Sequence, residues 1–232
     1  MPGTYHFFVR MAAGGIEMCG RYLFSEAEAE DILEIIRDVE GRTGAGTVKR
    51  GEIFPTDSAP ILLARDRSVR PELFVWGFPG FRGKNVIINA RAETAHEKPM
   101  FRRSLAARRC VIPSTGFFEW GIADNDGTAD SEVDIINPLL PVTGTRKGKP
   151  KKQKYLFRIP GEKVLYMAGL YNIYQDGPRF VILTTAANES MMDVHDRMPL
   201  ILRRELIEDW LFDDGKVPEL LRQSPVLEKT AV

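Results

Sequence analysis

Residues 108–120 read Arg-Arg-Cys-Val-Ile-Pro-Ser-Thr-Gly-Phe-Phe-Glu-Trp, and this stretch indicates how the chain folds. It holds two β-type runs, Cys110 to Ile112 and Phe117 to Trp120, joined by a short link with proline and glycine. Parallel neighbours need a crossover of a dozen or more residues, usually a helix. The short link therefore favours an antiparallel arrangement.

Most of the other β-type runs along the chain are also too close together for helical crossovers between them. We therefore predict an α+β fold: a single domain with a curled, mostly antiparallel β-sheet core flanked by short helices. The other predicted strands are Ala59 to Leu63, Leu73 to Trp76, Val86 to Asn89, Tyr155 to Ile159, Val164 to Tyr174 and Phe180 to Thr185.

Ser25 and Glu28 form a capping box that predicts a first helix ending near Asp38, and a glycine-rich loop follows from Gly41 to Gly51. Pro99 to Arg108 and Arg203 to Phe212 are the other predicted helices.

Composition narrows the class of protein. The 232 residues carry 32 basic and 32 acidic side chains, so no global field indicates a nucleic-acid partner. The chain has no run of about 18 apolar residues, so the sequence predicts no membrane-spanning helix. Two cysteines do not make a disulfide framework and fit a reducing cytoplasm. The three histidines and two cysteines lack the spacing of metal ligands, so we expect neither a metal nor another cofactor.

Three segments are expected to lie outside the core of a domain that spans residues 18–222. Residues 1–17 show no capping or periodic pattern, and we read them as a leader that arises from a misplaced start or is removed. Residues 122–153 pass from acidic to basic and read as a mobile surface insertion, with a second subdomain as the alternative. Residues 223–232 are expected to form a tail.

Cys19 follows Met18, and a chain that began at Cys19 would carry an α-amine and a thiol on adjacent carbons. The amine condenses with an aldehyde to an imine, and the thiol closes on the imine carbon to give a thiazolidine ring. At neutral pH on the order of 10% of an α-amine is unprotonated, against well under 0.1% of a lysine. The alternative is a small buried hydrophobic cysteine.

Other polar residues stand where core sequence would not place them. Asn89 and Arg91 directly follow an apolar run, at the end of a predicted strand. Glu119 lies between aromatic residues, where an apolar site would raise its pKa and allow it to donate a proton. A salt bridge with an arginine is the alternative for Glu119, and a structural hydrogen bond is the alternative for His195.

Several short stretches of this chain, in their sequence and in their order, resemble the SOS-response-associated peptidase family, also called abasic-site processing proteins. The resemblance spans about Met18 to Trp210. The matching stretches are Met18 to Tyr22, Trp76-Gly77, Asn89 to Thr94, Arg108 to Pro113, Gly116 to Trp120, Ala168 to Tyr171, Thr184 to Ala186 and His195 to Pro199.

The resemblance implies that the protein recognises abasic sites in single-stranded DNA and shields them as a thiazolidine formed by an N-terminal cysteine. It implies that Cys19 is the nucleophile, Asn89 orients its amine and thiol, Glu119 is the acid or base, and His195 assists proton transfer at the sugar. We expect a monomer in the cytoplasm, associated with the nucleoid if the source is bacterial. The implied DNA-binding residues are Arg21, Arg91 and Arg197 at phosphates, Trp76 and Trp120 as stacking surfaces, and Thr185.

Two departures from the family pattern stand out. The family usually has a second tryptophan after Trp76-Gly77, whereas this chain continues Phe78-Pro79-Gly80-Phe81 and offers Phe81 for stacking. Core packing is the alternative role for Trp76. The second departure is the leader, because an internal Cys19 has an amide nitrogen that cannot form an imine.

Two other classes of function remain open. A cysteine peptidase would use Cys19 and His195 as a dyad with Asn89 as the orienting residue. However, its nucleophile usually opens a helix, whereas Gly20-Arg21-Tyr22 reads as extended. A non-catalytic binder of single-stranded DNA would need the arginines and aromatics but would leave Glu119 and His195 unexplained.

Overall fold

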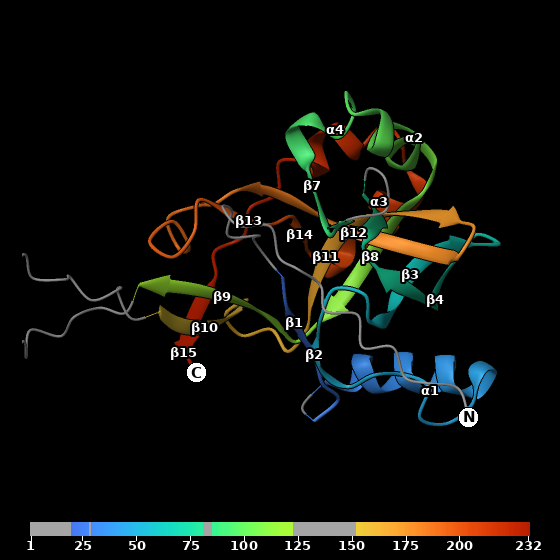
Figure 1. Ribbon diagram of the computed structural model, residues 1–232, viewed down its shortest axis with the longest axis horizontal. Helices are drawn as coiled ribbons and strands as arrows, with labels where there is room; N and C mark the ends of the chain where they lie inside the picture. Colours follow the sequence, from blue (N-terminus) through green and yellow to red (C-terminus); the bar gives the residue numbers. More distant parts are fainter. Residues whose placement is uncertain (1–19, 28, 81–84, 123–151) are drawn as a thin grey trace, which may run out of the picture.

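The structure, a computed structural model, describes residues 20–27, 29–80, 85–122 and 152–232 (Figure 1). Cys19, the proposed leader and Phe81 lie outside the described residues. So does most of the proposed insertion, of which only the two flanks are described.

Five strands form a closed ring at the centre of the molecule. β4 pairs with β3, β3 with β8, β8 with β11, and β11 with β12, all antiparallel. β12 then pairs in parallel with β4, which closes the ring. The prediction of a curled, mostly antiparallel sheet is confirmed. The ring strands are β3 (Ser58–Arg65), β4 (Ser68–Trp76), β8 (Arg109–Ser114), β11 (Leu165–Tyr174) and β12 (Gly177–Ala186).

Short strands extend this barrel at its rim. β7 (Asn89–Arg91) and β13 (Arg197–Pro199) both pair with β12, and β14 (Ile201–Leu202) pairs with β11. β5 (Phe78–Pro79) and β6 (Val86–Ile87) form a separate two-stranded sheet.

A second sheet leaves the barrel where β8 continues, after Thr115, into β9 (Figure 1). Gly116 makes this bend possible, because a Cβ there would lie 2.7 Å from Leu156 Cδ1 and 2.9 Å from the Phe157 carbonyl oxygen. Residues 108–120 thus connect the two sheets. The antiparallel pairing expected for their two runs is wrong, because β8 and β9 belong to different sheets. The order of the second sheet is β15 (Glu228–Ala231), β10 (Lys152–Arg158), β9 (Gly116–Ile122), β1 (Tyr22–Phe24) and β2 (Gly51–Ile53).

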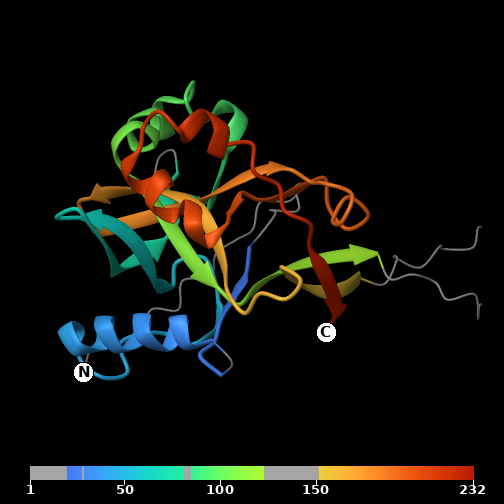
Figure 2. The same cartoon turned by 180° about the vertical axis from the view of Figure 1, so that it is seen from behind.

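The helices lie on opposite sides of the barrel, with the longest on one side and the others together on the other side (Figures 1 and 2). The two helices predicted at Pro99–Arg108 and Arg203–Phe212 are confirmed with small shifts. The longest helix is α1 (Glu30–Thr43); the others are α2 (Pro99–Ala107), α3 (Ile207–Phe212) and α4 (Val217–Leu220), with 3₁₀ turns at Ala92–Thr94 and Arg204–Leu206.

The predicted ends of the first helix were wrong. Ala29, not Ser25, is the residue before α1, and no side chain caps the helix. The helix also continues past Asp38 to Thr43. Packing explains the extension, because Val39 is buried and Arg42 donates to the Pro71 carbonyl oxygen at 2.6 Å. Tertiary contacts therefore extend the helix past Gly41, where the sequence predicted the start of a loop.

The expected tail joins the second sheet, since residues 228–231 form β15 beside β10. Leu227, just before it, is buried.

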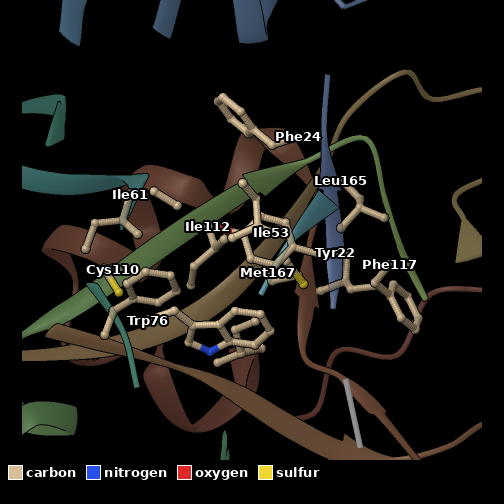
Figure 3. Close-up of a cluster of buried hydrophobic side chains, with 14 of the residues drawn as sticks. Tyr22, Phe24, Ile53, Ile61, Trp76, Cys110, Ile112, Phe117, Leu165 and Met167 are labelled. Atoms are coloured by element: carbon tan, nitrogen blue, oxygen red, sulfur yellow. The ribbon is translucent and has the colours of Figure 1, made fainter. Parts of the chain in front are cut away.

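Trp76 lies in the core between the two sheets, and Figure 3 shows its ring beside Tyr22. The Tyr22 and Trp76 ring centroids are 5.2 Å apart, and the Phe180 ring stacks on Trp76 with a centroid distance of 6.3 Å. The indole Nε1 donates to the Ile88 carbonyl oxygen at 3.1 Å. Trp76 is 0% exposed, so its proposed role as a base-stacking surface is wrong and core packing is its role.

Candidate active site at the junction of the two sheets

The first described strand runs beside the strand that carries Glu119. Tyr22 pairs with Phe117 and Leu23 with Gly116 in antiparallel register. Phe118 then donates its backbone N–H to the Arg21 carbonyl oxygen at 2.9 Å. Because antiparallel partners advance in opposite directions, Gly20 lies next along β9 toward Glu119.

The two faces of β9 carry different chemistry, because successive side chains in a strand point to opposite faces. Phe117 belongs to the core and stacks on Phe157 at 5.2 Å. Glu119 shares that inward face and is 1% exposed, so the burial expected for this carboxyl is confirmed. Phe118 and Trp120 occupy the other face.

A turn between β12 and β13, residues 187–196, carries His195. Its backbone is closed by hydrogen bonds from Ala187 N–H to the Asp196 carbonyl oxygen and from His195 N–H to the Met191 carbonyl oxygen. Val194 faces β9: a Cβ at Gly121 would lie 3.4 Å from Val194 Cγ1. Since Gly121 and Glu119 share one face, the turn packs against the side of β9 that holds the buried carboxyl.

The imidazole of His195 is held by its own turn and is 17% exposed. The Arg197 backbone N–H donates to Nδ1 at 3.1 Å. This contact makes Nδ1 an acceptor and puts the proton of a neutral ring on Nε2. Asp196 Oδ1 lies 2.9 Å from the same nitrogen and would accept a hydrogen bond from it if Nδ1 carried a proton.

The carboxyl-terminal segment braces this turn. Asn188 Nδ2 donates to the carbonyl oxygens of Ser224 and Pro225, at 3.3 and 2.8 Å. The Leu227 N–H donates to Ser190 Oγ at 3.0 Å, and Lys229 forms an ion pair with Asp193. No sequence pattern indicated this role for the segment expected to be a tail.

Asn89 and Arg91 enter the same region on β7, which pairs in parallel with β12. Asn89 is half-buried opposite Ile182, and Arg91 is exposed opposite Thr184. On its other side β12 pairs Ala186 with Arg197 of β13. β12 therefore brings Asn89, Arg91 and the His195 turn to one end of the barrel. Thr185, also on β12, is half-buried opposite Met198.

Arg197 is engaged within the protein. Its Nη1 and Nη2 contact Glu93 Oε1 and Oε2 at 2.6 and 2.8 Å, and Nη2 also donates to the Thr184 carbonyl oxygen at 2.7 Å. The guanidinium lowers the pKa of the Glu93 carboxyl, chiefly through the hydrogen bond. The phosphate contact implied for Arg197 thus competes with an existing bidentate partner that the sequence did not reveal.

Arg21 lies on the outer face of the second sheet, where its guanidinium carbon is 4.9 Å from the centre of the Trp120 ring. Its Nη1 also contacts Glu52 Oε2 at 3.0 Å. Trp120 is half-buried, so part of its surface remains open.

Within the described ranges no cluster of histidine, cysteine, aspartate or glutamate could hold a metal, and no helix is long and apolar enough to cross a membrane. A pocket lies elsewhere, beside the start of α1, where Asp31 accepts from the Tyr166 hydroxyl at 2.7 Å and contacts Arg204. Burial, aided by Asp31, raises the Tyr166 pKa.

The fold and the site define an α+β protein with a closed barrel, a second sheet, and a buried carboxyl on the strand face against which a histidine-bearing turn packs. The family model described as SOS response associated peptidase (SRAP) matches residues 18–231. The chain belongs to this family, as the motifs indicated.

Curated relatives carry informative names. The abasic site processing protein YoqW of Bacillus subtilis is 30% identical over 216 residues, which cover 88% of this chain and 85% of the relative. The abasic site processing protein YedK of Escherichia coli is 26% identical over 200 residues, 84% of this chain and 79% of the relative.

Solved structures share the fold. A protein from Bacteroides thetaiotaomicron superposes with a TM-score of 0.66 at 22% identity, covering 92% of each chain. A phage-related protein from Bordetella bronchiseptica gives a TM-score of 0.64 at 25% identity, covering 92% of this chain and 94% of that one.

Proposed function

We propose that this protein recognises abasic sites in single-stranded DNA and forms a covalent thiazolidine with them through Cys19, once Cys19 is the first residue. The names of the relatives support abasic-site processing. The observation that carries the proposal is the pairing of β1 with β9, because it directs the chain that follows Cys19 along the strand of the buried Glu119.

The chemistry follows from an aminothiol and an aldehyde. The α-amine of Cys19 attacks C1′ of the ring-opened deoxyribose, and the resulting carbinolamine loses water to give an imine. The thiol sulfur then adds to the imine carbon, and its proton passes to the nitrogen, which completes the five-membered ring. Each step moves a proton, so a buried carboxyl beside the reacting atoms is suited to general acid and base catalysis.

We assign these proton transfers to Glu119 and the protonation of the sugar oxygen to His195. The turn supports the second role, because Nδ1 accepts the Arg197 N–H and leaves Nε2–H as the donor of a neutral ring. Asn89 would orient the amine and thiol from β7. Arg91, which is exposed on the same strand, would contact a backbone phosphate.

The extended backbone after Cys19 favours this proposal over a cysteine peptidase. A peptidase thiol usually gains reactivity from the N-terminus of a helix. Here Tyr22–Phe24 form a strand, and α1 does not begin until Glu30. Aldehyde capture instead needs a free amine.

The test uses protein that begins at Cys19, as verified by intact mass, and single-stranded DNA that contains one abasic site. A band that survives boiling in denaturant is expected with this DNA and is not expected with intact DNA of the same sequence. Failure to form a stable band would reject the crosslinking proposal. Release of a peptide from a casein substrate by the same preparation would favour the peptidase.

A further inference from the structure

Cations and aromatic rings alternate across the outer face of the second sheet. The Phe54 ring lies 4.3 Å from the Arg21 guanidinium carbon and 5.0 Å from Lys49 Nζ. On the other side of Arg21 lies Trp120, at 4.9 Å, and then Lys154, whose Nζ is 5.9 Å from the Trp120 ring. We call these five residues, Lys49, Phe54, Arg21, Trp120 and Lys154, the cation–aromatic row.

The row stays open to solvent. Phe54 is 37% exposed, and Trp120 is half-buried. The cations also keep part of their surface, since the side chains of Lys49 and Arg21 are 41% and 30% exposed. Both rings therefore keep surface on which a base can stack.

We propose that the cation–aromatic row is a binding track for single-stranded DNA, with bases stacked on Phe54 and Trp120 and phosphates at the three cations. Non-specific single-strand binders combine aromatic platforms with positive groups that follow the backbone. The row supplies both elements in alternation, and Arg21 is two residues from Cys19 in the chain. The proposal rests on the proposed single-strand function and adds Phe54, Lys49 and Lys154 to it.

Two carboxylates now hold these cations. Glu52 contacts Lys154 Nζ at 2.6 Å and Arg21 Nη1 at 3.0 Å, while Asp57 contacts Lys49 Nζ at 2.5 Å. Lys154, followed by Arg21, lowers the pKa of Glu52, so Glu52 is an anion at neutral pH. A bound phosphate would take the place of Glu52 beside both cations. Glu52 is therefore a competitor that weakens DNA binding.

The first experiment measures binding of intact oligothymidylate by fluorescence anisotropy, because a strand without an aldehyde separates binding from crosslinking. Phe54→Ala should raise the Kd by about 5-fold to about 150-fold, the loss of one stacked base. Phe54→Trp should bind at least as well as the wild type. Phe212→Ala is the matched control, since Phe212 is a similarly exposed ring on α3 and should leave the Kd within twofold.

The second arm uses Glu52→Gln, which keeps the shape of the side chain and removes its charge. Binding should tighten several-fold and its salt dependence should steepen, because two cations are released toward phosphates. If Glu52→Gln only damaged the structure, the variant would not bind single-stranded DNA more tightly than the wild type. An unchanged Kd in Phe54→Ala, or weaker binding in Glu52→Gln, would overturn the track. If the track variants behave as expected but abasic DNA gives no adduct, the crosslinking proposal fails and the binding track stands.

Discussion

Glu93 and Arg197 are 104 residues apart in the chain and form a bidentate ion pair with contacts of 2.6 and 2.8 Å. Glu93 follows β7, which carries Asn89, and Arg197 begins β13, directly after the His195 turn. The pair therefore fastens together two segments that carry proposed catalytic residues. The Arg197 N–H that holds His195 Nδ1 belongs to the same anchored residue.

Glu93→Gln should slow adduct formation several-fold and lower stability at neutral pH, because it weakens this connection. Arg197 lowers the pKa of Glu93 below its ordinary 4.5, so the contribution of the pair is fully present above that value. It is lost as the pH falls through the lower folded-state pKa. Urea unfolding from pH 7 to pH 3 should show the difference between wild type and Glu93→Gln shrinking at acid pH. Glu97→Gln, at an exposed neighbouring carboxyl, is the control; a difference independent of pH would contradict the assignment.

Tyr22→Phe should leave the free energy of unfolding unchanged or raise it. The Tyr22 hydroxyl is buried without a hydrogen-bond partner among the described residues, and such a group costs about 1 to 3 kcal/mol. Tyr166→Phe is the matched control: it removes a hydroxyl that donates to the Asp31 carboxylate and should lose about 1.5 to 3 kcal/mol. Destabilisation by Tyr22→Phe of the same size as the control would show that the Tyr22 hydroxyl has a partner.

Glu119→Gln and His195→Ala should slow adduct formation while leaving the Kd for intact single-stranded DNA nearly unchanged. Neither residue is assigned to a phosphate or a base, and general acid–base catalysis contributes typically 10²- to 10⁴-fold to a rate. Single-turnover gels give the rate and anisotropy gives the Kd. Loss of DNA binding in Glu119→Gln would instead make this buried carboxyl a structural group.

Arg91→Ala should weaken binding to every single strand and reduce the slope of log K against log salt by about 0.7, as expected for one lost phosphate contact. Arg70→Ala is the matched control, since Arg70 is exposed on β4 and contacts Ser68 nearby. Titrations at several salt concentrations distinguish the two. Equal slopes for Arg91→Ala and wild type would remove Arg91 from the phosphate contacts.

Local patterns predicted the long strands well, but the expected strand Val86 to Asn89 is divided between β6 and β7. The run Ala59 to Leu63 became β3 (Ser58–Arg65), and Phe117 to Trp120 became β9 (Gly116–Ile122). The apolar character of a strand is a property of neighbouring residues, so it can be read from a short window. The burial of Glu119 between aromatics could be predicted for the same reason.

Relationships between distant segments could not be predicted. Nothing near Arg197 indicates that Glu93 will occupy its guanidinium, and nothing near Trp76 decides between the surface and the core. Phe54 reads as an ordinary apolar residue until folding sets Arg21 beside it. The hydrogen bonds from Asn188 to residues 224–225 likewise form only because the carboxyl-terminal segment folds back beside the His195 turn.

The most direct test of the central claim is tandem mass spectrometry of the crosslinked peptide, after digestion of protein and DNA. The proposal predicts that the sugar remnant is attached to a peptide whose first residue is Cys19, that both the nitrogen and the sulfur of Cys19 carry the modification, and that no free thiol remains there. A remnant on a lysine, or on a peptide in which Met18 still precedes Cys19, would contradict it.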